Sequence, residues 1–149
     1  MNQHPYLRAY MAGIAAPTAL LLVALTVFCL ARFVFNVPME IERVIIFPLT
    51  IIPNAFGLWN MLYVKLPRNW QTPIGLHGAL LWLFLAPTGF VIGTALGFIR
   101  ATEHGLMVFD IVHIPHWWLG VGPFFALAFY YLVWKYAVGF LNRLLGLAG

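Results

Sequence analysis

Four long apolar stretches constrain this sequence more than any other feature. They cover residues 11–35, 44–64, 74–99 and 116–140, and each has a Pro or a charged residue at one boundary at least. A helix needs roughly 20 mostly apolar residues to cross a hydrocarbon core of about 30 Å. Each stretch therefore predicts a transmembrane helix, and the residues that remain are too few for a separate soluble domain.

Helices explain these stretches better than the strands of a membrane barrel. Barrel strands alternate apolar and polar residues, whereas the segments 20–25 and 80–85 are apolar at every position. We therefore predict an all-α fold, with residues 1–149 forming one integral membrane four-helix bundle with short loops. A proline inside each span removes a backbone donor and kinks the helix. These prolines are Pro17, Pro48, Pro53, Pro87 and Pro123.

Composition excludes the main soluble classes. Only 8% of the residues are charged and 63% are hydrophobic, whereas about 25% charged residues is typical of a soluble domain. The net charge of +4 comes from 8 Lys and Arg against 4 Asp and Glu. That density is too low for a face that reads phosphates, so we expect no nucleic-acid partner.

The distribution of cations predicts the orientation. Lys and Arg are favoured in cytoplasmic loops. An even number of spans places both termini on one side, which carries five cations against three on the other. We therefore predict a multi-pass protein with both termini in the cytoplasm, in a bacterial inner membrane or an equivalent one. The five are Arg8, Lys65, Arg68, Lys135 and Arg143, and the three are Arg32, Arg43 and Arg100.

The centres of the predicted spans contain no Asp, Glu, Lys or Arg. Pumps and ion-coupled transporters place such groups at mid-membrane, so active transport is disfavoured. Nucleophilic catalysis has little support, because the chain lacks Ser and its lone Cys29 lies among apolar residues. We predict no catalytic residue.

Small residues in the third span predict close helix packing. Gly89, Gly93 and Gly97 recur every four residues, which places them on one helix face where another backbone can approach. The neighbour is either another helix of this chain or a helix of a homo- or hetero-oligomer. The leading hypothesis is therefore a small non-catalytic accessory subunit or self-associating module, whose partners are membrane lipids and other membrane helices.

Polar residues in the second span allow a second interpretation. Pro48 and Pro53 precede Asn54 and Asn60, two polar side chains within the predicted membrane region. The asparagines can form hydrogen bonds to a neighbouring helix. Alternatively, a helix broken by the prolines lines a cavity, and the protein binds or passively carries a lipophile such as a quinone, a lipid or haem.

The third loop brings acidic residues and histidines close together in the sequence and allows a third interpretation. If residues 103–114 form an interfacial helix, Glu103, Leu106, Asp110 and His113 share one face. Asp110, His113 and His116 are then candidate ligands for a divalent metal, and a metal-dependent enzyme becomes possible. The alternative is a hydrated loop whose side chains pair with Arg43, Arg100 or lipid headgroups.

Cofactors are not required by any of these patterns. Haem held by two histidines is disfavoured, because His77 falls at the opposite end of the spans from His113 and His116. We therefore predict no cofactor, with haem and a divalent metal as the two candidates considered.

Overall fold

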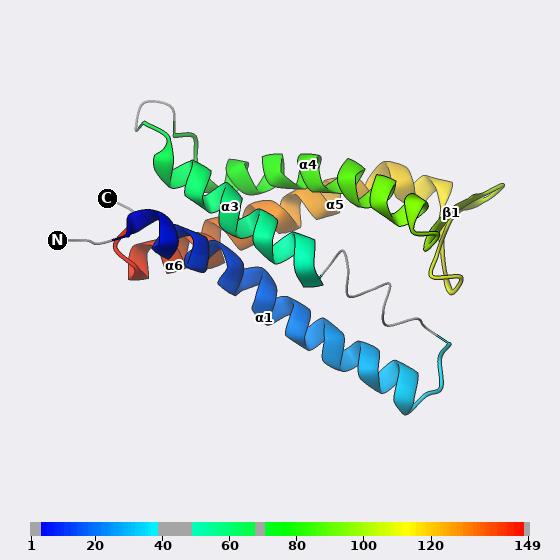
Figure 1. Ribbon diagram of the computed structural model, residues 1–149. Helices are drawn as coiled ribbons and strands as arrows, with labels where there is room; N and C mark the ends of the chain where they lie inside the picture. The colour runs from blue at the N-terminus through cyan, green and yellow to red at the C-terminus, as the bar shows by residue number, and fades with distance from the viewer. Residues whose placement is uncertain (1–3, 39–48, 68–70, 148–149) are drawn as a thin grey trace.

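The computed structural model describes residues 4–38, 49–67 and 71–147, which are mostly helical (Figure 1). The helices are α1 (Pro5–Phe33), α3 (Ile52–Lys65), α4 (Ile74–Ala95), α5 (His116–Leu132), the π-helical segment η3 (Val133–Val138) and α6 (Gly139–Leu144). Helices α5, η3 and α6 follow one another without a break. Three helical segments, α1, α4 and the run His116–Leu144, are long and apolar enough to cross a membrane, which supports a membrane protein.

The helices run between two ends of the molecule (Figure 1). We call the end with the first turn of α1 and the last turn of α6 the terminal end, and the opposite end, where α4 gives way to strands, the hairpin end. Helix α3 is shorter than the predicted second span, since it begins at Ile52. Residues 44–48 of that predicted span lie outside the described residues.

The third span ends earlier than predicted because of Gly97. Helix α4 stops at Ala95, and Gly97 adopts a φ of 75°, in the left-handed region that favours glycine. The Phe98 N–H donates to the Gly93 carbonyl at 3.0 Å, and the Gly97 N–H donates to the Thr94 carbonyl at 3.1 Å. This pair of bonds is a Schellman motif, which satisfies the last carbonyls of the helix.

The prediction of an all-α fold is wrong at the hairpin end. Strands β1 (Ile99–Thr102), β2 (Gly105–Val108) and β3 (Val112–Pro115) form an antiparallel sheet in the order β1-β2-β3. The interfacial helix predicted over residues 103–114 is therefore absent, and its expected common face does not form. Arg100, Met107 and His113 instead lie side by side across the three strands.

Two tight turns explain why this segment is a sheet. A two-residue loop joins β1 to β2, and a type I′ turn joins β2 to β3, with φ of 56° at Phe109 and 57° at Asp110. Aspartate tolerates this conformation better than most residues, whereas phenylalanine seldom adopts it. Phe109 is held there by stacking on Phe98, with the ring centroids 5.1 Å apart.

The hydrophobic core lies between α3, α4 and η3. Phe56 packs against Trp134, with ring centroids 5.6 Å apart, and both side chains are buried. Leu81, Leu85 and Val138 complete the cluster. Helix α5, in contrast, contains no buried residue. Packing is therefore dense toward the terminal end and sparse toward the hairpin end.

Candidate functional site

Helices α1 and α3 make their closest contact at two glycines. A Cβ atom added to Gly13 would lie 2.5 Å from the Phe56 carbonyl oxygen and 2.8 Å from the Gly57 Cα. A Cβ atom added to Gly57 would lie 2.6 Å from the ring of Tyr10. The missing side chains therefore allow the two backbones to touch, as small residues do in membrane helix pairs.

Asn60 links three helices at the terminal end. Its amide nitrogen donates to the Ala9 carbonyl of α1 at 2.7 Å and to the Asn142 Oδ1 of α6 at 2.8 Å. Asn142 returns a bond to the Asn60 Oδ1 at 2.9 Å. Both asparagines are at most 1% exposed. A buried amide needs such partners, so this network holds α1, α3 and α6 in one arrangement.

Asn54 forms a second polar link between α1 and α3. Its amide nitrogen donates to the Thr50 carbonyl at 2.7 Å, one turn earlier, and its oxygen accepts a hydrogen bond from the Tyr10 hydroxyl. Thr50 lies in the π-helical turn that precedes α3. The side chain of Asn54 thus bonds both to its own helix, one turn earlier, and to α1.

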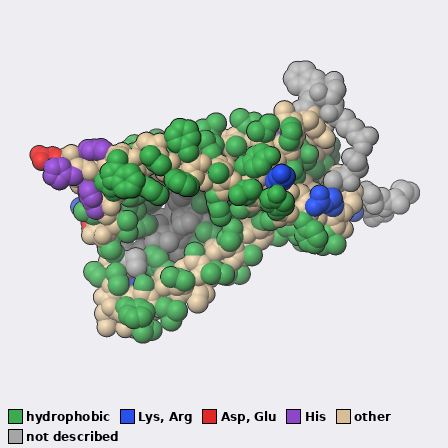
Figure 2. Space-filling view, turned by 180° about the vertical axis from the view of Figure 1, so that it is seen from behind, with side chains coloured by type: hydrophobic (Ala, Val, Ile, Leu, Met, Phe, Trp, Pro, Cys, Tyr) green, Lys and Arg blue, Asp and Glu red, His purple; other side chains and the backbone are tan. Residues whose placement is uncertain are grey.

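Beyond Pro17, α1 diverges from the other helices (Figure 1). Pro17 is the last buried residue of this helix. A crevice of about 240 Å³ opens at this point between α1, α3 and the α5–η3 junction, and a hollow between α1 and α5 is visible in Figure 2. Among the described residues that line the crevice, Tyr130 carries the only polar side-chain atom. The lining residues are Pro17, Leu20, Leu21, Ala24, Ile52, Phe56, Phe129, Tyr130 and Val133.

Sequence reasoning did not find this crevice, although two of its residues carried a signal. Pro17 was singled out as a kink in the first span, and Ile52 adjoins Pro53 in the disturbed second span. Neither observation reveals that residues of three helices converge. The crevice forms because Pro17 lies near Ile52 and Tyr130, which are more than 30 positions away in the sequence.

The three glycines predicted as one packing face have different roles. A Cβ atom added to Gly93 would lie 2.4 Å from the Ile99 side chain, so Gly93 packs against its own chain. Gly97 lies beyond α4 and would meet nothing within 4 Å. Gly89 is half-buried in α4. The predicted face therefore lacks Gly97, which lies outside the helix, and Gly93 already contacts Ile99 of the same chain.

The predicted metal ligands are dispersed over the hairpin end. Asp110 lies in the β2–β3 turn, where its Oδ1 is 3.2 Å from an Arg100 guanidinium nitrogen. His113 lies on β3 opposite Met107, and His116 begins α5. Within residues 4–38, 49–67 and 71–147, no three His, Cys, Asp or Glu side chains come together in a group that could hold a metal ion. Asp110, His113 and His116 therefore do not form the predicted metal site in this structure.

His77 is a buried polar residue at the terminal end of α4. It is 8% exposed, its ring lies 4.8 Å from the ring of Tyr63, and its Nε2 has no hydrogen-bond partner. His113, on β3, and His116, the first residue of α5, lie at the hairpin end, so most of the length of α4 separates them from His77 (Figure 1).

Comparison with known proteins adds no family. No family model matches this chain, and no curated protein or solved structure does.

Proposed function

We propose that this protein is a non-catalytic membrane protein that binds a lipophilic molecule in the crevice between α1, α3 and α5. The crevice carries the proposal, because it is the place where three helices leave an apolar space at mid-length. Its volume is about 240 Å³, and eight of its nine lining residues have wholly apolar side chains. Concave, mostly apolar sites with few polar groups are typical of small-molecule binding.

The lining residues favour a hydrocarbon chain over haem. Haem iron needs an axial ligand such as His, Met, Cys or Tyr, and Tyr130 is the only such residue in the crevice. A lipid acyl chain or a quinone tail needs no such ligand. The Tyr130 hydroxyl then offers one hydrogen bond to a carbonyl or ester group of the ligand.

Assembly with other helices, the leading hypothesis from sequence, is our second candidate. Its main support was the glycine face of the third span, and Gly93 already packs against Ile99. The close glycine contacts at Gly13, Gly57 and Gly78 also lie within this chain. These positions are not available to a partner, which favours ligand binding.

Two alanines of α1 provide a matched test. Ala24 lines the crevice, whereas Ala19 is exposed on the same helix outside the crevice lining. We expect native mass spectrometry of the detergent-purified protein to reveal one bound lipophile per chain. Ala24→Trp fills the crevice and should lower occupancy at least tenfold, whereas Ala19→Trp should leave it unchanged.

Each outcome of this test assigns or removes a function. An empty wild-type protein, or equal occupancy in both variants, would overturn ligand binding. A stable dimer that Ala24→Trp dissociates and Ala19→Trp preserves would assign the crevice to a second copy, in favour of assembly. A protein that is empty and monomeric would remove both candidates.

A further inference from the structure

Two apolar grooves flank the last turns of α3 at the terminal end. One groove, of about 490 Å³, lies between α3 and the start of α1, and the other, of about 440 Å³, lies between α3 and α4. Leu62 and Lys65 line both grooves, so they form the ridge between them. The first is also lined by Tyr6, Leu58 and Met61, and the second by Trp59, Leu66, Pro67 and His77.

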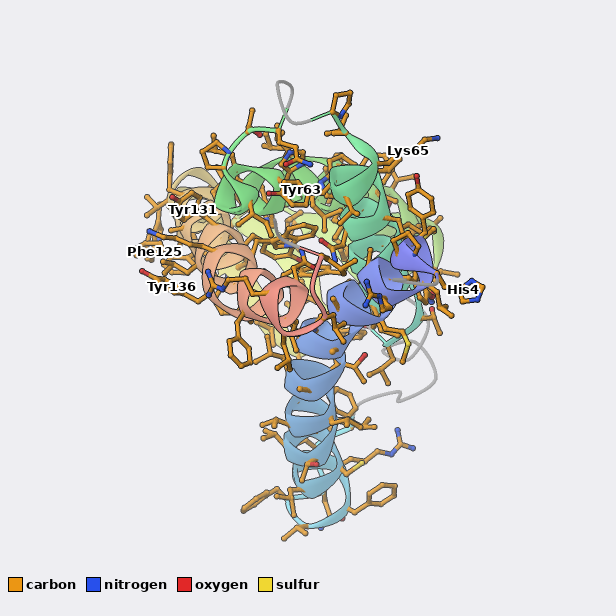
Figure 3. All side chains as sticks on the ribbon, turned by 90° about the vertical axis from the view of Figure 1, so that its left-hand side faces the viewer. His4, Tyr63, Lys65, Phe125, Tyr131 and Tyr136 are labelled. Carbon is orange, nitrogen blue, oxygen red and sulfur yellow. The ribbon has the colours of Figure 1, made fainter. Side chains whose placement is uncertain are left out.

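Among the described residues that line the two grooves, Lys65 is the only Lys, Arg, Asp or Glu. It is exposed, and its side chain points outward from the end of α3, whereas Tyr63 lies between the helices (Figure 3). The acidic residues that the structure describes, Glu103 and Asp110, both lie at the hairpin end, where Figure 2 shows red side chains. Within the described residues, Lys65 therefore has no carboxylate partner.

We propose that an anionic lipid with two hydrocarbon chains binds astride α3, with its phosphate beside the Lys65 Nζ and one chain in each groove. A cation between two apolar channels matches a molecule whose two chains diverge from one negative head. Basic sites between membrane helices bind anionic headgroups in this way. The lysine stem covers apolar surface while its ammonium group stays at the headgroup level.

This site is separate from the crevice of the proposed function. The two grooves and the crevice share no lining residue. Failure of one proposal therefore leaves the other intact, and variants at each site can be read independently.

The charge requirement is tested with two lipids that share the same chains. We expect native mass spectrometry to detect about fivefold stronger binding of phosphatidylglycerol than of phosphatidylcholine, the selectivity expected from one cation near the headgroups. Lys65→Gln should abolish this preference. Lys135→Gln is the matched control at the same end, because Lys135 lies over the rings of Tyr131 and Tyr136, at 5.8 and 5.3 Å, and should preserve the preference.

The two-chain requirement is tested by filling one groove at a time. Leu58 lines only the first groove and Leu66 only the second. Leu58→Trp and Leu66→Trp should each weaken phosphatidylglycerol binding about fivefold. Each should leave lysophosphatidylglycerol, which has one chain, unaffected, since the other groove stays open.

Three results would overturn the proposal. The first is a preference for phosphatidylglycerol that survives Lys65→Gln. The second is displacement of the lipid by excess inorganic phosphate, which would assign Lys65 to a free anion. The third is unchanged binding of the two-chain lipid in both tryptophan variants.

Discussion

The two halves of α1 are packed in opposite ways, although both are apolar. Between Ala9 and Pro17 the helix buries four residues, and beyond Pro17 it buries none. The first half contains Ala9, Ala12 and Gly13, which are buried, and the second contains Leu22, Val23 and Val27, which are exposed. In a bilayer, lipid tails are as apolar as leucine, so apolar side chains alone do not select a neighbour. Small residues and polar bonds make that selection here.

The largest effect should come from Gly13, where a side chain has no space. Gly13→Leu places atoms against the backbone of α3 and should lower the free energy of unfolding in detergent by about 3 kcal/mol. Gly120→Leu is the control, because a Cβ atom there meets nothing within 4 Å. Equal stability losses in the two variants, measured by denaturant titration, would contradict the contact between α1 and α3.

A pair of leucines compares the buried core, represented by Leu81 of α4, with the open half of α1. Leu81 is 0% exposed and Leu22 is 59% exposed. Leu81→Ala should cost about 2.5 kcal/mol through lost packing and the cavity left behind. Leu22→Ala should cost less than about 0.5 kcal/mol, since lipid or detergent replaces the lost methyl groups. Similar unfolding free energies for these variants would show that the open half of α1 is packed as tightly as the core.

The asparagine network should contribute a smaller, shared amount. Asn142→Ala leaves Asn60 with an unpaired amide oxygen in a buried place and should cost about 1.5 kcal/mol. Asn60→Ala should lower the free energy of unfolding by less in the Asn142→Ala variant than in the wild-type protein. The expected coupling in this double-mutant cycle is about 1 kcal/mol. Strictly additive unfolding free energies would mean that the two side chains do not interact.

The smallest effect should come from the ion pair at the hairpin end. Arg100 and Asp110 are exposed by 60% and 56%, and exposed pairs contribute little because water and salt screen them. Asp110→Asn removes the charge while keeping a residue that tolerates the turn conformation. It should change the unfolding free energy by less than about 0.5 kcal/mol. A loss above about 1 kcal/mol would indicate that the hairpin supports the helices.

The helices could be anticipated from the sequence more fully than the hairpin. Apolar length and flanking prolines predict spans near α1, α4 and α5, because transfer into a membrane depends on local composition. The prediction of a helix over residues 103–114 is wrong, because the helical spacing of Glu103, Asp110 and His113 does not exclude a hairpin. The β2–β3 turn carries Phe109 and Asp110 where Asn-Gly or Asp-Gly is the usual signal. Its conformation depends on Phe98, which stacks on Phe109 from outside the segment.

The candidate sites show the same division. Asn60 was recognisable as a polar residue within a span, but its partner Asn142 lies 82 residues away. Lys65 was recognisable as a cation near a membrane boundary, but the grooves on either side of it come from α1, α3 and α4. The sequence around Asn60 does not indicate Asn142 as its partner, and the sequence around Lys65 does not indicate the two grooves.

Residue order alone was enough to place this chain in a bilayer and to give it an uncharged interior, since the energy of burying each residue in lipid is a local property. The tertiary structure determines which faces meet: Gly13 packs against Gly57, Asn60 bonds to Asn142, and α1 buries no residue beyond Pro17. Composition does not encode those choices, because apolar surfaces are nearly equivalent toward lipid and toward protein. The crevice and the grooves beside Lys65 exist as a result of those pairings.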